Sequence, residues 1–287
     1  MLDYRLDDET ETLRKTVREF AHEVLAPQIG EFYERDEFPT AIVRQMGELG
    51  LFGLPFPEEY GGAGGTYFDL CVVLEELARV DSSMAITVEA GVSLGAMPIY
   101  RFGTPAQKQE WLPRLCTGEA LGAFGLTEPG GGSDAGATKT TARLEDGHWV
   151  INGSKAFITN GGSSLTELVT VTAVTGTKPD GRKEISAIIV PSGTPGFTVG
   201  QRYSKVGWNA SDTRELAFDD VRVPEENLVG ERAAATPSSS RSSTRAGSRS
   251  RRCRPDSPRA ASTSRSSTRP SARRSASRSG ATRPSSS

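Results

Sequence analysis

Apolar residues recur at helical spacing through the first 119 residues of the chain. A stripe from Leu13 to Val24 follows the i, i+3, i+4 pattern, which predicts a helix with one buried face. Asp7 and Asp8 are residue types that cap helix starts, and Pro27 lies just beyond the stripe. The pattern therefore predicts a first helix that begins at the two aspartates and ends before the proline.

Further helices are expected before residue 120. Residues 40–49 place Met46 and Leu49 on an inward face, and Gly50 follows as a stop. Residues 53–65 are too rich in Pro and Gly for regular structure and are expected to form a loop. The remaining predicted helices span 67–80, 82–100 and part of 102–119.

Short segments at strand spacing follow between Ala120 and Val223. They are rich in β-branched and aromatic residues and are separated by turn residues, which favours antiparallel connections. The predicted strands span 148–153, 168–175, 185–190 and 215–223, with turns at 145–147, 179–181 and 192–196. The pattern therefore predicts an antiparallel barrel or sandwich. The expected fold class is α+β, with an N-terminal all-α helical domain over 1–119 and an antiparallel β-barrel domain over 120–232.

The composition changes beyond residue 232. Residues 233–287 contain no Leu, Ile, Val, Phe, Met, Tyr or Trp, and they are dominated by Ser and Arg. The net charge of −2 for the whole chain therefore combines an acidic segment with a basic one. A segment that buries so little apolar surface is expected to form a disordered C-terminal tail.

Several function classes are disfavoured by the sequence. Cys71, Cys116 and Cys253 have no C-x-x-C spacing and the chain has two His, so neither a metal site nor a disulfide scaffold is expected. The acidic start lacks the apolar segment of a secretory signal, and no apolar run approaches the roughly 20 residues that span a membrane. We expect a cytoplasmic protein without a membrane span.

Two segments carry candidate chemistry: AFGLTEPGGGSDAGATKT at 123–140 and AFITNGG at 156–162. The glycines permit close backbone approach to a pyrophosphate or a planar ring, while Thr127, Ser133 and Thr159 supply hydroxyls. GGGSDA formally matches the dinucleotide fingerprint, but a proline precedes it and strands rather than a βαβ unit surround it. The combination suits a flavin better than a metal, a nicotinamide or a nucleic acid.

Residues 1–232 resemble the acyl-CoA dehydrogenases through their N-terminal helical and middle β domains. Several long motifs occur in the family's order and spacing, and the SDTREL segment is similar to the short-chain or branched-chain members. The matching segments are YGGAGGTYFDLCVVLEELARVDSSMA, YRFGTPAQKQEWLPRLCTGE, FGLTEPGGGSDAGATKT, WVINGSKAFITNG and KVGWNASDTRELAFDDVRVPEENLVGE.

The resemblance implies FAD as cofactor, an acyl-CoA substrate and oxidation to a trans-2-enoyl-CoA. It implies that Leu126 offers backbone and Thr127 its hydroxyl to the flavin pyrimidine side, that Ser133 also touches the thioester, and that Thr159 bonds flavin N5. Many relatives have Trp where this chain has Phe157. The residues implied to bind the cofactor are Phe124, Leu126, Thr127, Gly132, Ser133, Phe157, Ile158 and Thr159.

Intact family members use an electron-transferring flavoprotein as acceptor, form homotetramers and carry the catalytic glutamate of most members in a second helical bundle after the β domain. Residues 233–287 show no such bundle, so the expected set of catalytic residues is empty. Five glutamates could be considered as substitute bases. Glu58 and Glu59 are expected to be solvated surface groups, Glu75 and Glu76 to mark the polar side of a helix, and Glu89 is the remaining candidate.

We interpret the tail as the product of a frameshift. A TCN serine codon read one base upstream becomes NTC, which encodes Phe, Leu, Ile or Val, so a serine-rich segment can conceal apolar helices. GC-rich codons for residues from Ala233 onward, shifted by one base, read as segments similar to the opening of the missing bundle. The alternative to a frameshift is an Arg-rich arm that binds nucleic acid, against which the absence of Lys and aromatic residues counts. For the function, an active dehydrogenase and a non-catalytic remnant of the family both stay open, and we expect the remnant for the chain as given because no base is in place.

Overall fold

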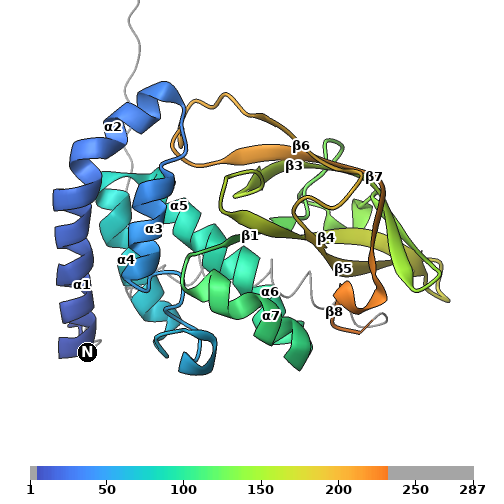
Figure 1. Ribbon diagram of the computed structural model, residues 1–287, viewed down its shortest axis with the longest axis horizontal. Helices are drawn as coiled ribbons and strands as arrows, with labels where there is room; N and C mark the ends of the chain where they lie inside the picture. The colour runs from blue at the N-terminus through green and yellow to red at the C-terminus, as the bar shows by residue number, and fades with distance from the viewer. Residues whose placement is uncertain (1–4, 232–287) are drawn as a thin grey trace, which may run out of the picture.

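The helices form one side of the molecule and the strands the other (Figure 1). This computed structural model describes residues 5–231, so the expected disordered tail at 233–287 lies outside the described residues. The helices are α1 (Asp8–Phe20), α2 (Ala26–Arg35), α3 (Thr40–Glu48), α4 (Tyr67–Val80), α5 (Ser82–Ala90), α6 (Met97–Phe102) and α7 (Pro105–Cys116). The π-helical turns η1 (Ala21–Leu25) and η3 (Gly91–Ala96) and the 3₁₀ turn η2 (Glu58–Tyr60) complete the helical side.

The first helical segment begins as predicted but runs past Pro27 to Arg35. The side chain of Asp7 accepts a hydrogen bond from the backbone N–H of Thr10, as expected of a cap. The predicted end was wrong because η1 widens the helix before the proline: the N–H of Ala26 bonds the carbonyl of Ala21, five residues back. This π-helical turn gives the pyrrolidine ring room that a regular α-helix lacks.

The other helices fall close to their predicted positions. Met46 in α3 is fully buried and Gly50 follows in the left-handed region with φ +74°, as the pattern predicts. Leu49 was wrongly placed in the core, because it lies after the last turn of α3 and is 41 % exposed. The loop at 53–65 is confirmed, interrupted by η2 alone.

Within residues 5–231, eight strands form one sheet. They are β1 (Leu121–Gly125), β2 (Thr141–Glu145), β3 (His148–Thr159), β4 (Thr166–Thr177), β5 (Lys183–Pro191), β6 (Phe197–Arg202), β7 (Thr213–Pro224) and β8 (Leu228–Val229). The four predicted strands correspond to β3, β4, β5 and β7, each longer than expected. The sequence reasoning did not assign β1, whose five residues are all buried and therefore do not alternate.

The sheet is mostly antiparallel, in the order β6-β7-β3-β2-β4-β5-β8, with β1 paired to β4. The predicted barrel is wrong, because β6 and β8 stand at opposite ends of this order and do not pair with each other in residues 5–231. Strand spacing and turn residues determine which strands are antiparallel neighbours, but they carry no information about whether the last strand meets the first.

β1 and β2 lie in succession along the same edge of β4. β1 pairs in parallel with β4 from Leu121–Thr166 to Gly125–Val171, and β2 touches β4 further along, at Thr141–Val174. Residues 126–140 therefore leave the sheet between two strands that share an edge. We call residues 126–140 the site loop.

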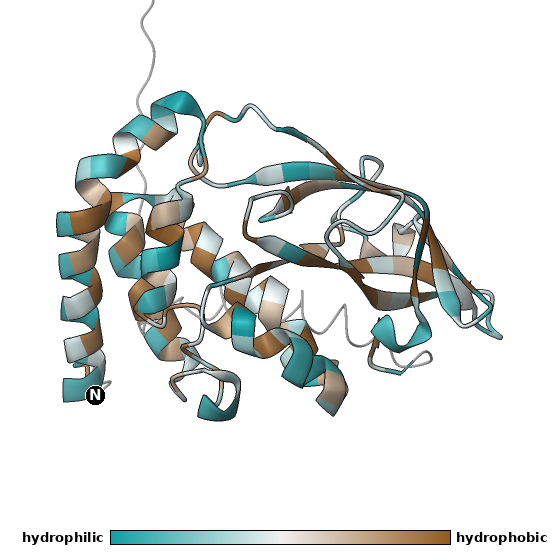
Figure 2. Ribbon diagram, in the orientation of Figure 1, coloured by the Kyte–Doolittle hydropathy of each residue, from teal (hydrophilic) through white to brown (hydrophobic). Residues whose placement is uncertain are grey.

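Apolar side chains of the helices continue into one face of the sheet. A single buried cluster includes Val88, Val92 and Ile99 from the helices together with Leu168 and Ile189 from β4 and β5. Figure 2 shows apolar residues, in brown, in both the helices and the strands, and polar residues, in teal, recurring along α1. No described helix is long and apolar enough to cross a membrane.

Candidate functional site

The fold brings the two candidate segments together. The backbone N–H of Ala156 donates to the carbonyl of Thr127 over 2.8 Å, which joins the site loop to β3. Gly132 folds back onto Thr127, since a Cβ on the glycine would lie 3.1 Å from the threonine Cγ2. Residues 126–133 therefore lie beside residues 156–159, although about 25 residues separate them in sequence.

Phe157 stands at an irregular point of β3. The register between β3 and β7 shifts between Lys155 and Ile158, and Phe157 has φ +60°. This bulge turns the phenyl ring outward, where it is 63 % exposed and stacks on Tyr203 at 4.9 Å between ring centroids. The ring offers a flat apolar surface beside the site loop.

The predicted cofactor residues occupy three kinds of position. Phe124 and Ile158 are buried, so only their backbone is available to a ligand. Ser133 is exposed near the middle of the site loop, and Leu126 is half-buried. Thr127, Gly132 and Thr159 are half-buried next to Phe157.

Polar groups without protein partners face this region. Within residues 5–231, the hydroxyls of Thr127, Ser133 and Thr159 make no hydrogen bond, and neither do the amide N–H groups of Leu126 and Thr127. Partly buried donors of this kind are normally satisfied by protein, water or a ligand. Unpaired donors around an exposed aromatic ring fit a planar group with several acceptor atoms, which describes an isoalloxazine.

A buried ion pair lies beneath the site loop. The ammonium of Lys155 is fully buried and donates to Glu128 Oε1 at 2.8 Å, to the Leu126 carbonyl at 3.3 Å and to Thr172 Oγ1 at 3.3 Å. The Glu128 carboxylate also accepts from the N–H of Lys139 at 2.8 Å and from the N–H and hydroxyl of Thr140 at 3.0 and 2.7 Å. Glu128 thus holds both ends of the loop.

Sequence reasoning missed this pair. A lysine within the apolar strand that contains Ile151 and Ile158 was the signal that a buried partner had to exist. The identity of that partner was not readable, because Glu128 lies 27 positions away in a loop.

Burial alone would raise the pKa of Glu128, but the hydrogen bonds from Lys155, Thr140 and Lys139 outweigh it and lower the pKa to about 2. Burial lowers the pKa of Lys155 from its ordinary value, and the adjacent carboxylate opposes that change. Four donors within 3.0 Å converge on the two oxygens of Glu128 and hold its carboxylate in the charged form.

The stability contributed by Glu128 is expected to depend on pH. Its pKa is lower in the folded state than its ordinary 4.5, so the unfolded chain binds the proton first as pH falls. The contribution is fully present above about pH 4.5 and is lost as pH approaches 2, by about 3 kcal/mol in total. Urea unfolding of the parent and of Glu128→Gln from pH 2 to 6 measures this: the difference between them should shrink as pH falls. A difference that does not change with pH would contradict it.

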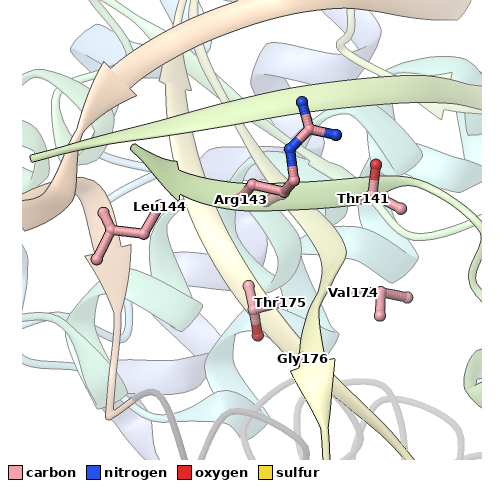
Figure 3. A pocket seen from close by; sticks show the side chains of 7 residues that line it. Thr141, Arg143, Leu144, Val174, Thr175 and Gly176 are labelled. Atoms are coloured by element: carbon pink, nitrogen blue, oxygen red, sulfur yellow. The ribbon is translucent and has the colours of Figure 1, made fainter. Parts of the chain in front are cut away.

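An open pocket lies elsewhere, where β2 and β4 diverge (Figure 3). It contains none of the predicted cofactor residues; its lining is Thr141, Ala142, Arg143, Leu144, Val174, Thr175 and Gly176. The described residues also contain no cluster of side chains that would hold a metal ion.

Comparison with known proteins identifies the family. Residues 7–119 match the model of the acyl-CoA dehydrogenase N-terminal domain, and residues 123–221 match that of the middle domain. The chain belongs to the acyl-CoA dehydrogenase family. It is 46 % identical over 230 residues to the Bacillus subtilis protein YngJ, named as a probable acyl-CoA dehydrogenase, covering 80 % of this chain and 60 % of that protein. It is 43 % identical over 236 residues to the short-chain specific acyl-CoA dehydrogenase of Clostridium acetobutylicum, covering 82 % and 62 %.

Solved structures of family members have the same fold. Butyryl-CoA dehydrogenase from Megasphaera elsdenii matches with a TM-score of 0.79 and 40 % identity, covering 84 % of this chain and 63 % of that one. An acyl-CoA dehydrogenase from Bacillus anthracis complexed with FAD matches with a TM-score of 0.76 and 37 % identity, covering 83 % and 40 %. The chain spans about 60 % of the length of the curated relatives it matches.

Two carboxylates of the described residues, Glu128 and Glu76, are held in ion pairs with Lys155 and Arg18. Glu128, the carboxylate next to Thr127, is a poor proton acceptor with its lowered pKa. Glu76 was wrongly expected on the surface: it is 3 % exposed and accepts two hydrogen bonds from Arg18, at 2.8 and 2.9 Å. Glu75 is exposed and pairs with Arg79, while burial raises the pKa of Glu89.

Proposed function

We propose that residues 5–231 are the FAD- and thioester-binding part of an acyl-CoA dehydrogenase that acts on short-chain acyl-CoA thioesters. The observation that carries this proposal is the meeting of residues 126–133 with residues 156–159 around an exposed phenyl ring and unpaired donors. The Clostridium relative named as short-chain specific and the butyryl-CoA dehydrogenase structure support the short-chain assignment. The FAD complex from Bacillus anthracis supports the cofactor.

The proposed roles follow from the position of each group. The N–H groups of Leu126 and Thr127 and the Thr127 hydroxyl would bind the pyrimidine side of the isoalloxazine. Phe157 would lie against the ring, and the Thr159 hydroxyl would donate to N5. Phe124, Ile158 and Gly132 would contribute backbone, the last permitting close approach.

Ser133, exposed near the middle of the site loop, would bind both the cofactor and the thioester. When bound, FAD would supply the hydride acceptor that removal of the β-hydrogen of the acyl group requires. The residues described here hold and orient the reactants and, through apolar Phe157, exclude water from one side. An electron-transferring flavoprotein is the proposed acceptor. A chain of a solved structure described as that of such a flavoprotein from Acidaminococcus fermentans matches this one with a TM-score of 0.79 and 40 % identity, covering 84 % of this chain and 63 % of that one.

We propose further that the chain as given binds FAD without turnover. Proton abstraction needs a carboxylate of suitable basicity within hydrogen-bond reach of the substrate, and Glu128 is not one. Residues 233–287 contain no Glu, in keeping with the proposed frameshift. The gene sequence across codons 225–245 tests that origin directly: an intact reading frame would remove the frameshift proposal.

Addition of FAD to the purified full chain is expected to give a bound flavin that survives gel filtration with its visible absorbance band. Adding butyryl-CoA under anaerobic conditions should leave that band unbleached, because no base is positioned. A colourless protein in excess FAD would contradict the binding proposal. Bleaching by butyryl-CoA would contradict the inactive assignment while supporting the substrate.

A further inference from the structure

The groups that face the proposed flavin depend on what lies beneath the site loop. A trans peptide is planar, so its C=O and N–H point in opposite directions. The carbonyl of Gly125 accepts from the Thr172 hydroxyl at 3.2 Å, and the carbonyl of Leu126 accepts from Lys155 Nζ at 3.3 Å. The N–H groups on the other side of these two peptides, those of Leu126 and Thr127, are therefore turned away from β4 and from Lys155.

These are the same two amides that find no partner within the described residues. Gly125 allows the arrangement, because a Cβ there would lie 3.1 Å from Cγ of Lys155, whose stem crosses β1 at this point. A side chain at residue 125 would push the Lys155 stem aside by a few tenths of an ångström, so Gly125 leaves room for the lysine.

We propose that Lys155 is a positioning residue of the flavin site, and that with Glu128 and Thr172 it fixes the two peptides whose N–H groups bind the isoalloxazine. The inference rests on the proposed function. Lys155 and Thr172 are fully buried behind the loop, so neither touches the ligand and both act through the backbone of Gly125 and Leu126. Glu128 supplies the counter-charge and holds the distal end of the loop through Lys139 and Thr140.

β4 offers a closely matched pair of substitutions. Thr172 and Thr170 are both fully buried on the same strand, yet the Thr170 hydroxyl has no hydrogen-bond partner among the described residues. Threonine to valine removes the hydroxyl at constant shape in both. Thr172→Val should weaken FAD binding to the full chain about tenfold, as expected for loss of a buried hydrogen bond. Thr170→Val should leave the dissociation constant within about twofold.

A second variant removes the charges together. The single variant Lys155→Met would leave the Glu128 carboxylate buried without its counter-charge. The double variant Lys155→Met/Glu128→Gln avoids this, because both side chains are then neutral. It should bind FAD about a hundredfold more weakly than the parent, even where its melting temperature equals that of the parent. If the double variant bound FAD as tightly as the parent whenever its melting temperature matched that of the parent, the two residues would have a merely structural role and the proposal would be overturned. Parental FAD affinity in Thr172→Val would also overturn it.

Hydrogen exchange of the apo chain gives a readout independent of flavin. The amides of Lys139 and Thr140 donate to the Glu128 carboxylate, and the amide of Ala156 donates to the Thr127 carbonyl. All three amides should exchange faster in the double variant. Unchanged exchange there would overturn the positioning role. A parent that never binds FAD would remove the proposed function alone, because exchange would still report whether Lys155 holds the loop.

Discussion

Replacement of Glu128 by alanine is expected to lower the free energy of unfolding by about 3–5 kcal/mol. The side chain is 9 % exposed, and its loss leaves the ammonium of Lys155 buried with no counter-charge. The amides of Lys139 and Thr140 also lose their acceptor. An uncompensated buried charge costs far more than the intact pair contributes, which makes this one of the most damaging single changes in the described chain.

Urea unfolding followed by tryptophan fluorescence measures the effect. Glu145→Ala is the matched control, since it removes a carboxylate that pairs with Arg143 at 3.0 Å while 44 % of its side chain is exposed. That change should alter stability by no more than about 0.5 kcal/mol. Equal losses in the two variants would mean that the Glu128 pair is not effectively buried.

The helical half of the fold was readable from local signals. Thr66 and Thr104 begin α4 and α7 with capping boxes that pair each threonine with Asp69 or Gln107, three residues on. These signals act over a single turn, so sequence alone carries them. The failure at Pro27 came from a non-local cause, because only a π-helical turn, which no short motif announces, lets the helix continue.

The sequence predicted parts of the sheet and parts of the candidate site, but not the contacts between distant segments. Alternation located β3 but not its bulge, and without the bulge the strand pattern does not turn Phe157 outward. Motifs singled out both halves of the candidate site, since each is contiguous. The support of Lys155 for the site loop joins β1, β3 and β4, and such a contact exists only after the chain has folded.

Gly95→Ala is expected to destabilise the protein by about 1–3 kcal/mol through overpacking. Gly95 lies in η3 directly against β1, and a Cβ there would come within 2.5 Å of the Gly122 carbonyl oxygen. Backbone on both sides leaves no flexible side chain to yield, so helix and strand must separate. Because β1 leads straight into the site loop, FAD affinity should fall together with stability.

Gly30→Ala is the same chemical change, but it is expected to raise the stability of the protein rather than lower it. Gly30 is an exposed residue of α2, and a Cβ there would meet nothing within 4 Å. Alanine restricts the unfolded chain and favours the helix, so stability should rise by about 0.5–1 kcal/mol. Thermal unfolding of the two variants compares them directly, with melting temperatures moving in opposite directions from the parent. A Gly95→Ala protein that melts at or above the parent temperature would show that η3 and β1 are not in close backbone contact, and would contradict the expected link between this contact and FAD affinity at the site loop.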